Sequence, residues 1–162
     1  MSAWLAFLLA GVAAQPVPPP LRAELEPLRF LVGHCWRGAM KQGAEQDTHC
    51  FEPVYGGQHV RDRHEVTGAA APYSGETLYS WNGVEKRIDY VYFNSLGGVS
   101  RGSMMPRPGL LDFGGDTYTG ADGTRMSISI IWRMIDERTY EAVTTSSANP
   151  TGQRVVRFTR LD

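Results

Sequence analysis

The sequence predicts an all-β protein: an antiparallel up-and-down β-barrel of about nine to ten strands, preceded by a short N-terminal helix. Three observations predict this fold class. Short runs of about four to ten residues alternate between apolar and polar side chains, as half-buried strands do. Turn-forming residues separate these runs, and 18 glycines and 10 prolines contribute to them. The links are short, so successive runs are expected to pair as antiparallel neighbours.

The elements are expected in the following order. A short helix comes first, within LRAELEPLRFLVG at residues 21–33, because Leu21, Leu25 and Leu28 recur at helical spacing. Pro27 limits it to one or two turns. Strands are then expected at residues 34–41, 47–53, 58–67, 76–82, 87–94, 99–105, 110–114, 124–135, 139–146 and 153–161.

Tight turns connect these strands, and Asn-Gly in WNGVEK and Asp-Gly in GADGT are the clearest hairpin signals. A meander of this length twists until its last strand meets its first, which removes the exposed edges. A two-sheet sandwich is the alternative, but it needs long crossing connections. The one long link, GAAAPYSG at 68–75, has the length of a lid over the barrel mouth or of a plain loop.

The first 14 residues predict a signal peptide. The run from Ala3 to Ala14 is uncharged and apolar, too short for a bilayer that needs about 20 residues, and it ends in small residues. A proline-rich linker at 15–20 follows, and residues 21–162 form a single domain. An uncleaved anchor or a buried N-terminal helix is the alternative. We expect a periplasmic or secreted protein with no stable membrane span after cleavage.

Composition and motifs restrict the function classes. Sixteen basic and 17 acidic residues are interspersed at a net charge of −1, so no nucleic-acid partner is expected. The sequence lacks Gly-x-Ser-x-Gly, His-Glu-x-x-His, a phosphate-binding glycine loop and a nucleotide fingerprint. An enzymatic role is therefore left open but not favoured, and the oligomeric state is left open.

Cys35 and Cys50 are the two cysteines of the chain. A turn at Gln42-Gly43 pairs residues whose numbers sum to 85, which sets the two cysteines opposite each other. In an exported protein this placement favours a disulfide, while two buried thiols are the alternative. A zinc site with His34 and His49 is disfavoured because adjacent strand residues point to opposite faces, so no metal is expected.

LRFLVGHCWRG at 28–38, followed by FEPVYGGQHVRDRHEV at 51–66, resembles a lipocalin-like group of the calycin superfamily, small and mostly uncharacterised bacterial barrels. The residues that match are Leu28, Leu31, Gly33, Trp36, Gly56 and Gly57. The resemblance implies a barrel with a tryptophan at its bottom, and some related ten-stranded barrels hold haem through one histidine. It implies little about chemistry, because such barrels host unrelated functions.

Polar residues on strand 58–67 are candidates for function. Asp62 and His64 share a face with two valines, so they are expected to point into the barrel. There, Asp62 could hold the His64 ring in one tautomer and make it a base or a ligand anchor. Ordinary solvated salt bridges are the alternative.

Aromatic residues could line a pocket or simply form the core: Tyr79, Trp81, Tyr90, Tyr92 and Trp132. The leading hypothesis is an exported barrel that binds a small hydrophobic or amphipathic molecule in its interior and needs no cofactor. A haem-binding barrel using His64 or His59 is the first alternative. A small enzyme using the Asp62–His64 pair and a structural envelope role are the others.

Overall fold

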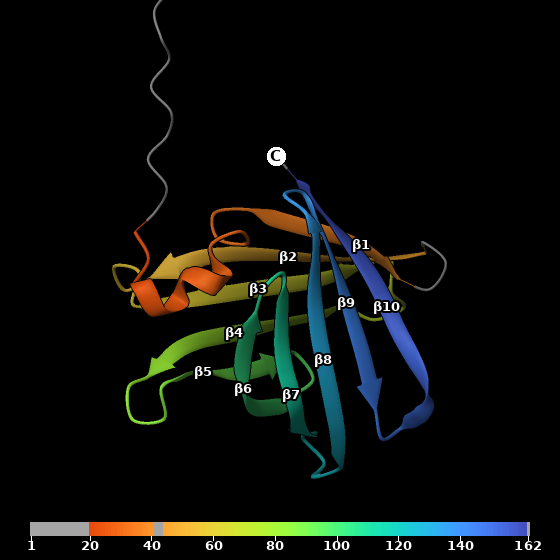
Figure 1. Cartoon of the computed structure of the whole chain (residues 1–162). Coiled ribbons are helices and arrows are strands. Elements are labelled where there is room, and N and C mark those ends of the chain that lie inside the picture. The colour runs from red at the N-terminus through yellow and green to blue at the C-terminus, as the bar shows by residue number, and fades with distance from the viewer. Residues whose placement is uncertain (1–19, 41–43, 162) are drawn as a thin grey trace, which may run out of the picture.

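The computed structural model describes residues 20–40 and 44–161, which form a closed antiparallel barrel of ten strands after one short 3-10 helix (Figure 1). The predicted fold class is confirmed. The helix η1 spans Ala23–Leu28. The strands are β1 (Cys35–Met40), β2 (Glu45–Val54), β3 (His59–Thr67), β4 (Tyr73–Asn82), β5 (Arg87–Asn94), β6 (Val99–Arg107), β7 (Leu110–Thr119), β8 (Arg125–Asp136), β9 (Thr139–Ser146) and β10 (Asn149–Leu161).

The predicted signal peptide at 1–14, the linker apart from Pro20, and the turn at Gln42-Gly43 lie outside the described residues. Each strand pairs with its neighbours in sequence, and β10 returns to pair with β1, from Cys35 opposite Leu161 to Gly38 opposite Phe158. This closure leaves neither terminal strand with an unpaired edge, so a two-sheet sandwich is excluded for the described part of the chain.

Three strands depart from the predicted limits by three residues or more, and the other differences are of one or two residues. β7 continues to Thr119 instead of ending at residue 114, because Gly114, at φ 60°, forms an irregularity that shifts the register without ending the strand. β10 begins at Asn149 instead of residue 153, because its pairing with β9 continues past a register shift between Asn149 and Arg154. β4 begins at Tyr73, so the link is 68–72 and Tyr73 belongs to a strand; the expectation of a loop or lid carrying this tyrosine is wrong.

The interior next to η1 is packed with aromatic side chains. Trp36 is fully buried, donates a hydrogen bond from Nε1 to the Leu31 carbonyl at 3.3 Å, and meets Tyr140 edge-on at 5.3 Å between ring centroids. Leu25 and Leu28 of η1 are fully buried beside this packing, as the helical stripe predicts. We call this region the aromatic half: Trp36, Phe51, Tyr79, Tyr90, Phe113, Trp132, Tyr140 and Phe158.

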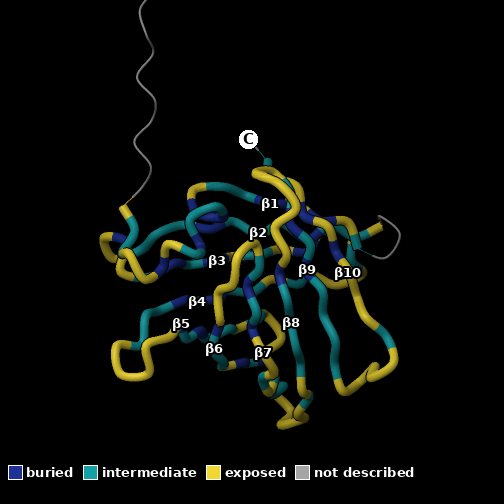
Figure 2. The backbone as a smooth tube through the Cα atoms, in the orientation of Figure 1, coloured by how far each residue is buried: buried dark blue, intermediate teal, exposed yellow. Residues whose placement is uncertain are grey.

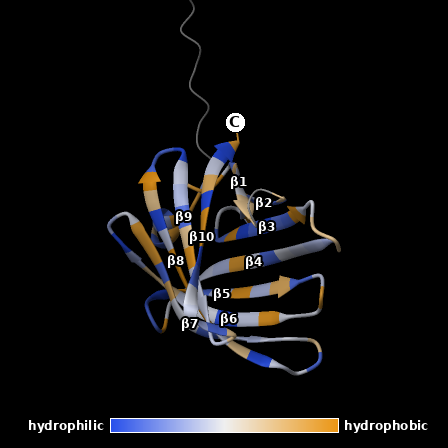
Figure 3. Cartoon of the chain, turned by 90° about the vertical axis from the view of Figure 1, so that its right-hand side faces the viewer, coloured by the Kyte–Doolittle hydropathy of each residue, from blue (hydrophilic) through white to orange (hydrophobic). Residues whose placement is uncertain are grey.

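The other end of the barrel carries the turns at 68–72, 95–98, 120–124 and 147–148. Buried residues concentrate within the strands, and the hairpin turns are exposed (Figure 2). Hydrophilic and hydrophobic residues alternate along many of the strands, as a two-sided sheet requires (Figure 3). We call the interior at this end the polar half: Asp47, His49, Asp62, His64, Tyr73, Tyr92 and Asn94.

Cys35 and Cys50 form a disulfide between β1 and β2. The whole β1–β2 register follows the sum of 85 that the sequence predicts, from Cys35 opposite Cys50 to Met40 opposite Glu45. Because disulfides persist in oxidising compartments, the bond favours a location outside the cytosol. Among the described residues, no helix has both the length and the hydropathy to cross a membrane.

Candidate functional site

Neighbouring positions on β2 and β3 bring four ionisable side chains to one place inside the barrel. His49 lies directly opposite His64, and Phe51 lies opposite Asp62. Strand alternation places Asp47 and His49 on the interior face of β2, the face that buries Phe51. Asp62 and His64 share the interior face of β3 with the buried Val60 and Val66, as the sequence analysis expected from that alternation.

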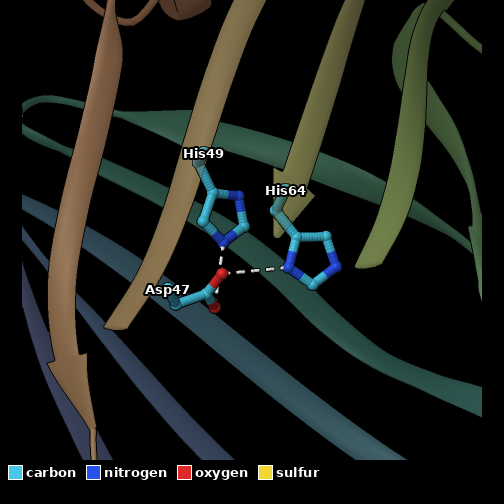
Figure 4. Close-up of side chains that lie close together, drawn as sticks. All are labelled: Asp47, His49 and His64. Carbon is cyan, nitrogen blue, oxygen red and sulfur yellow. Dashed lines mark hydrogen bonds and ion pairs between the residues drawn. The ribbon is translucent and has the colours of Figure 1, made fainter. Parts of the chain in front are cut away.

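The four residues form two diagonal pairs across the strand boundary. His49 Nδ1 lies 2.9 Å from Asp62 Oδ2, and His64 Nδ1 lies 3.1 Å from Asp47 Oδ1. His49 Nε2 also reaches Asp47 Oδ2 at 3.3 Å, so Asp47 contacts both imidazoles (Figure 4). The two rings stack, with centroids 4.7 Å apart and planes at 16°.

The partners therefore differ from the predicted Asp62–His64 pair. Asp62 and His64 follow each other on one side of a strand, about 6.6 Å apart along it, and their side chains run roughly parallel. Diagonal neighbours on β2 lie within reach, and the hydrogen bonds of both residues go to that strand instead.

A chain of hydrogen bonds continues from His64 toward the barrel mouth. His64 Nε2 lies 3.0 Å from the Tyr92 hydroxyl, which lies 2.7 Å from the Tyr73 hydroxyl. Asn94 Nδ2 donates to Tyr73 at 3.3 Å and to Tyr118 at 3.1 Å. The side-chain oxygen Oδ1 of Asn94 accepts hydrogen bonds from two backbone N–H groups. These bonds fix the amide so that its NH2 group faces the two tyrosine hydroxyls.

The electrostatics of the cluster follow from these bonds. Burial opposes a charge on the His49 ring, but the Asp62 carboxylate and the hydrogen bond to Asp47 outweigh burial and raise the pKa of His49 to about 10. Burial also opposes ionisation of Asp47, yet hydrogen bonds from His49 and His64 hold the pKa of Asp47 well below its usual range. At neutral pH, His49 is therefore an imidazolium between two carboxylates.

A glycine makes room for this arrangement. A Cβ atom on Gly75 of β4 would lie 2.5 Å from His64 Nε2 and 2.6 Å from the Tyr92 ring. Gly75 is paired with His64 on one side and with Asn94 on the other. The absence of a side chain there lets His64 and Tyr92 meet across β4.

The cluster offers converging ligand atoms. One ligand atom each from Asp47, His49 and His64 lies within 4.8 Å of the other two. Imidazole nitrogens and a carboxylate oxygen are ligands for borderline metal ions, and they also hydrogen-bond polar groups of organic ligands. The arrangement can therefore hold a cation or orient a polar ligand group.

The aromatic candidates divide between the two halves. Tyr79, Tyr90 and Trp132 belong to the buried aromatic core, and Trp81 is partly buried against it. Tyr92 instead joins the polar cluster through His64. His59, an alternative haem ligand, lies on the face of β3 opposite His64, 2.7 Å from the Ser80 hydroxyl.

The sequence analysis missed Asp47, His49 and Tyr73 as site residues. A signal for the first two was present: extending the register across the turn after Val54 pairs residues whose numbers sum to 113, which sets His49 opposite His64. Tyr73 carried no comparable signal, because it follows the irregular link at 68–72.

A hollow of about 580 Å³ lies beside the cluster, lined by His64, Gly75 and Asn94 together with Thr48, Cys50, Arg63, Glu65, Ser74, Glu76, Phe93 and Ser95. Most of these residues occupy outward positions on β2 to β5, so the hollow is mainly a concavity of the outer sheet surface. We therefore base the site on the interior cluster. No protein-family model matches the chain, and no curated protein matches it significantly.

Proposed function

We propose that this protein is an exported, lipocalin-like barrel that binds a small, amphipathic molecule in its polar half. One observation carries the proposal: apart from the buried Asp47 and Asp62, the side chains that define the polar half keep partial solvent exposure, whereas those of the aromatic half are buried. On β8, Ile128 and Met126 share the face of the buried Trp132 but are themselves partly exposed. A ligand bound there would cover apolar surface that is otherwise partly exposed.

The two walls of the polar half have different chemistry. In the closed strand order, β3 and β8 stand on opposite sides of the barrel, five strands apart in either direction. β3 contributes His64, and β8 contributes Met126, Ile128 and Ile130. A ligand with one polar end and one apolar end fits these walls, since pockets bind by apolar contact and orient by a few polar groups.

The same proposal includes a location outside the cytosol. The apolar leader ending at Ala14 and the Cys35–Cys50 disulfide both support a periplasmic or secreted protein. A barrel that binds small molecules in such a compartment would carry or sequester them, and this requires no catalytic group.

A ligand panel tests the proposal. The mature chain from Gln15 onward is titrated with fatty acids, retinoids and haem in buffer containing EDTA, and tryptophan fluorescence is followed. Trp132 is a suitable reporter, because its ring lies 6.3 Å from the His49 ring at the boundary between the halves. We expect saturable binding of at least one amphipathic class.

Two matched variants locate the binding. Ile128→Trp fills the interior of the polar half, whereas Ile131→Trp places the same bulk on the outer face of the same strand. We expect the first variant to lose at least tenfold in affinity and the second to bind as the unmodified protein does. Absence of saturable binding across the panel, or equal affinity in both variants, would contradict the proposal.

A further inference from the structure

We propose that Asp47, His49 and His64 form a binding site for a divalent transition-metal ion inside the barrel, with Zn²⁺ as the reference ion. This inference does not depend on an organic ligand. It rests on the identity of the three ligands, on their separations and on the side chains that orient them.

The ligand set is two histidines and one carboxylate. Such a set binds Zn²⁺ in catalytic sites and Fe²⁺ in the two-histidine, one-carboxylate sites of oxygenases. His49 would coordinate through Nε2, His64 through Nδ1 and Asp47 through a carboxylate oxygen. Three protein ligands leave at least one coordination position for water or another small ligand.

The separations fit one ion. Bond lengths of about 2.0–2.1 Å place two ligands of one ion about 2.8–3.0 Å apart in octahedral and about 3.3–3.4 Å apart in tetrahedral geometry. His49 Nε2 lies 3.3 Å from Asp47 Oδ2, and His64 Nδ1 lies 3.1 Å from Asp47 Oδ1. One ligand atom from each of the three residues lies within 4.8 Å of the other two, so binding one ion requires the two stacked rings to turn toward Asp47.

Both imidazoles have their second nitrogen occupied, as metal-bound histidines do. His49 Nδ1 donates to the carboxylate of Asp62, which is only 2% exposed, at 2.9 Å. His64 Nε2 contacts the Tyr92 hydroxyl, and the bond between Tyr92 and Tyr73 can run in either direction. These contacts direct the remaining nitrogen of each ring toward Asp47, an arrangement that orients and strengthens metal ligands.

Charge and access agree with a cation. Asp47 and Asp62 place two carboxyl groups at the cluster, and carboxylate oxygens favour a divalent cation. The His49 and Asp47 side chains remain 14% and 12% exposed, so an ion can reach them from the polar half.

The test uses mature protein purified without a histidine tag and freed of metal by chelation. Co²⁺ is added as a spectroscopic probe and Zn²⁺ as a competitor, while visible absorption and calorimetry are recorded. We expect one Co²⁺ per chain with visible bands that Zn²⁺ abolishes. Because no organic molecule is present, failure here leaves the ligand-panel result intact, and the reverse also holds.

Variants distinguish this site from binding elsewhere. Asp47→Asn and His64→Gln should each weaken Zn²⁺ binding by about a hundredfold or more, since each removes a ligand. Asp62→Asn retains the three ligands and should weaken binding by about 10–100-fold through the orientation of His49. His59→Gln removes a histidine on the outer face and should bind as the unmodified protein does.

Near-ultraviolet circular dichroism checks that each variant retains its packing. Where a ligand variant fails to fold, Asp62→Asn and Tyr92→Phe still test the proposal, because neither removes a ligand. Absence of binding in the unmodified protein, or binding that His59→Gln abolishes and the Asp62 and Tyr92 variants leave unchanged, would overturn the assignment.

Discussion

The two halves of the barrel interior are built by the same strand alternation and filled in opposite ways. In the aromatic half, Tyr140 stacks on Phe158 with centroids 4.9 Å apart, and Trp36 meets both Phe30 and Tyr140 edge-on. In the polar half, the corresponding inward positions hold carboxylates, imidazoles and tyrosine hydroxyls. His49 marks the boundary, because its ring meets Phe158 edge-on at 5.2 Å while its nitrogens face Asp47 and Asp62.

The difference separates stability from function. Buried aromatic side chains stabilise a fold through apolar burial and ring contacts. Buried carboxylates and imidazoles stabilise it little, because desolvation offsets their attraction. A barrel built for stability alone would continue the aromatic packing to the second end. The polar half is therefore where we place ligand and metal binding.

The largest effect is expected in the aromatic half. Trp36→Ala leaves a cavity beside Tyr140 and should lower the free energy of unfolding by about 3–5 kcal/mol. Tyr92→Phe, a smaller change in the polar half, removes one hydroxyl and should lower it by about 1 kcal/mol. Urea denaturation measures both, and equal losses would remove the distinction between the halves.

Loss of the disulfide should lower the free energy of unfolding of the whole barrel rather than of one half. The Cys35–Cys50 bond closes a loop of 15 residues, so the double variant to serine should lose about 3 kcal/mol in the chain-entropy model. Because the bond lies on β1 and β2 away from the interior cluster, we expect Zn²⁺ affinity to change little in protein that remains folded. A loss of metal binding parallel to the loss of stability would show that the halves are not independent.

The free energy of unfolding should change with pH because His49 titrates. Its pKa is raised to about 10 in the folded protein from a usual value near 6.5, so its contribution is fully present below about pH 6.5 and is lost as the pH rises through 10. In metal-free protein we expect a fall on the order of 3 kcal/mol between pH 7 and 9.5. His49→Gln should flatten this slope, and an unchanged slope in that variant would contradict the assignment.

A smaller effect on stability than loss of the disulfide is expected at Gly75. Its replacement by alanine places a methyl group against His64 and Tyr92 and should cost about 1–2 kcal/mol. Gly83 in the β4–β5 turn is the control, because a Cβ atom there meets no neighbouring atom within 4 Å. Denaturation curves for the two alanine variants should therefore differ, and coinciding curves would mean that the polar cluster repacks without cost.

Local patterns in the sequence predict the fold better than the site. A turn at Gln42-Gly43 pairs residues whose numbers sum to 85, and this rule alone gives the β1–β2 register and the cysteine pairing. The β2–β3 register is harder to predict, because the turn after Val54 has four residues, 55–58, of which Tyr55, Gly56 and Gly57 have positive φ. The partners of Asp62 and His64 depend on that register.

Strand-pairing rules do not predict contacts between side chains on two strands that are separated by a third strand. The Tyr90 hydroxyl on β5 donates to Asp116 Oδ2 on β7 at 2.6 Å. A Cβ atom on Gly102 of β6 would lie 2.6 Å from that hydroxyl, so a glycine lets the two side chains meet. Such contacts depend on barrel curvature and on side-chain length, which spacing in a single sequence does not determine.

The most direct test of the polar half is a crystal structure of the mature protein soaked in Zn²⁺, with an anomalous difference map calculated at the zinc edge. We predict one interior peak about 2.0–2.2 Å from His49 Nε2, His64 Nδ1 and an Asp47 oxygen, with solvent or ligand density beside it. A map with its peaks on the barrel exterior alone, over a polar half closed by packed side chains, would contradict the account.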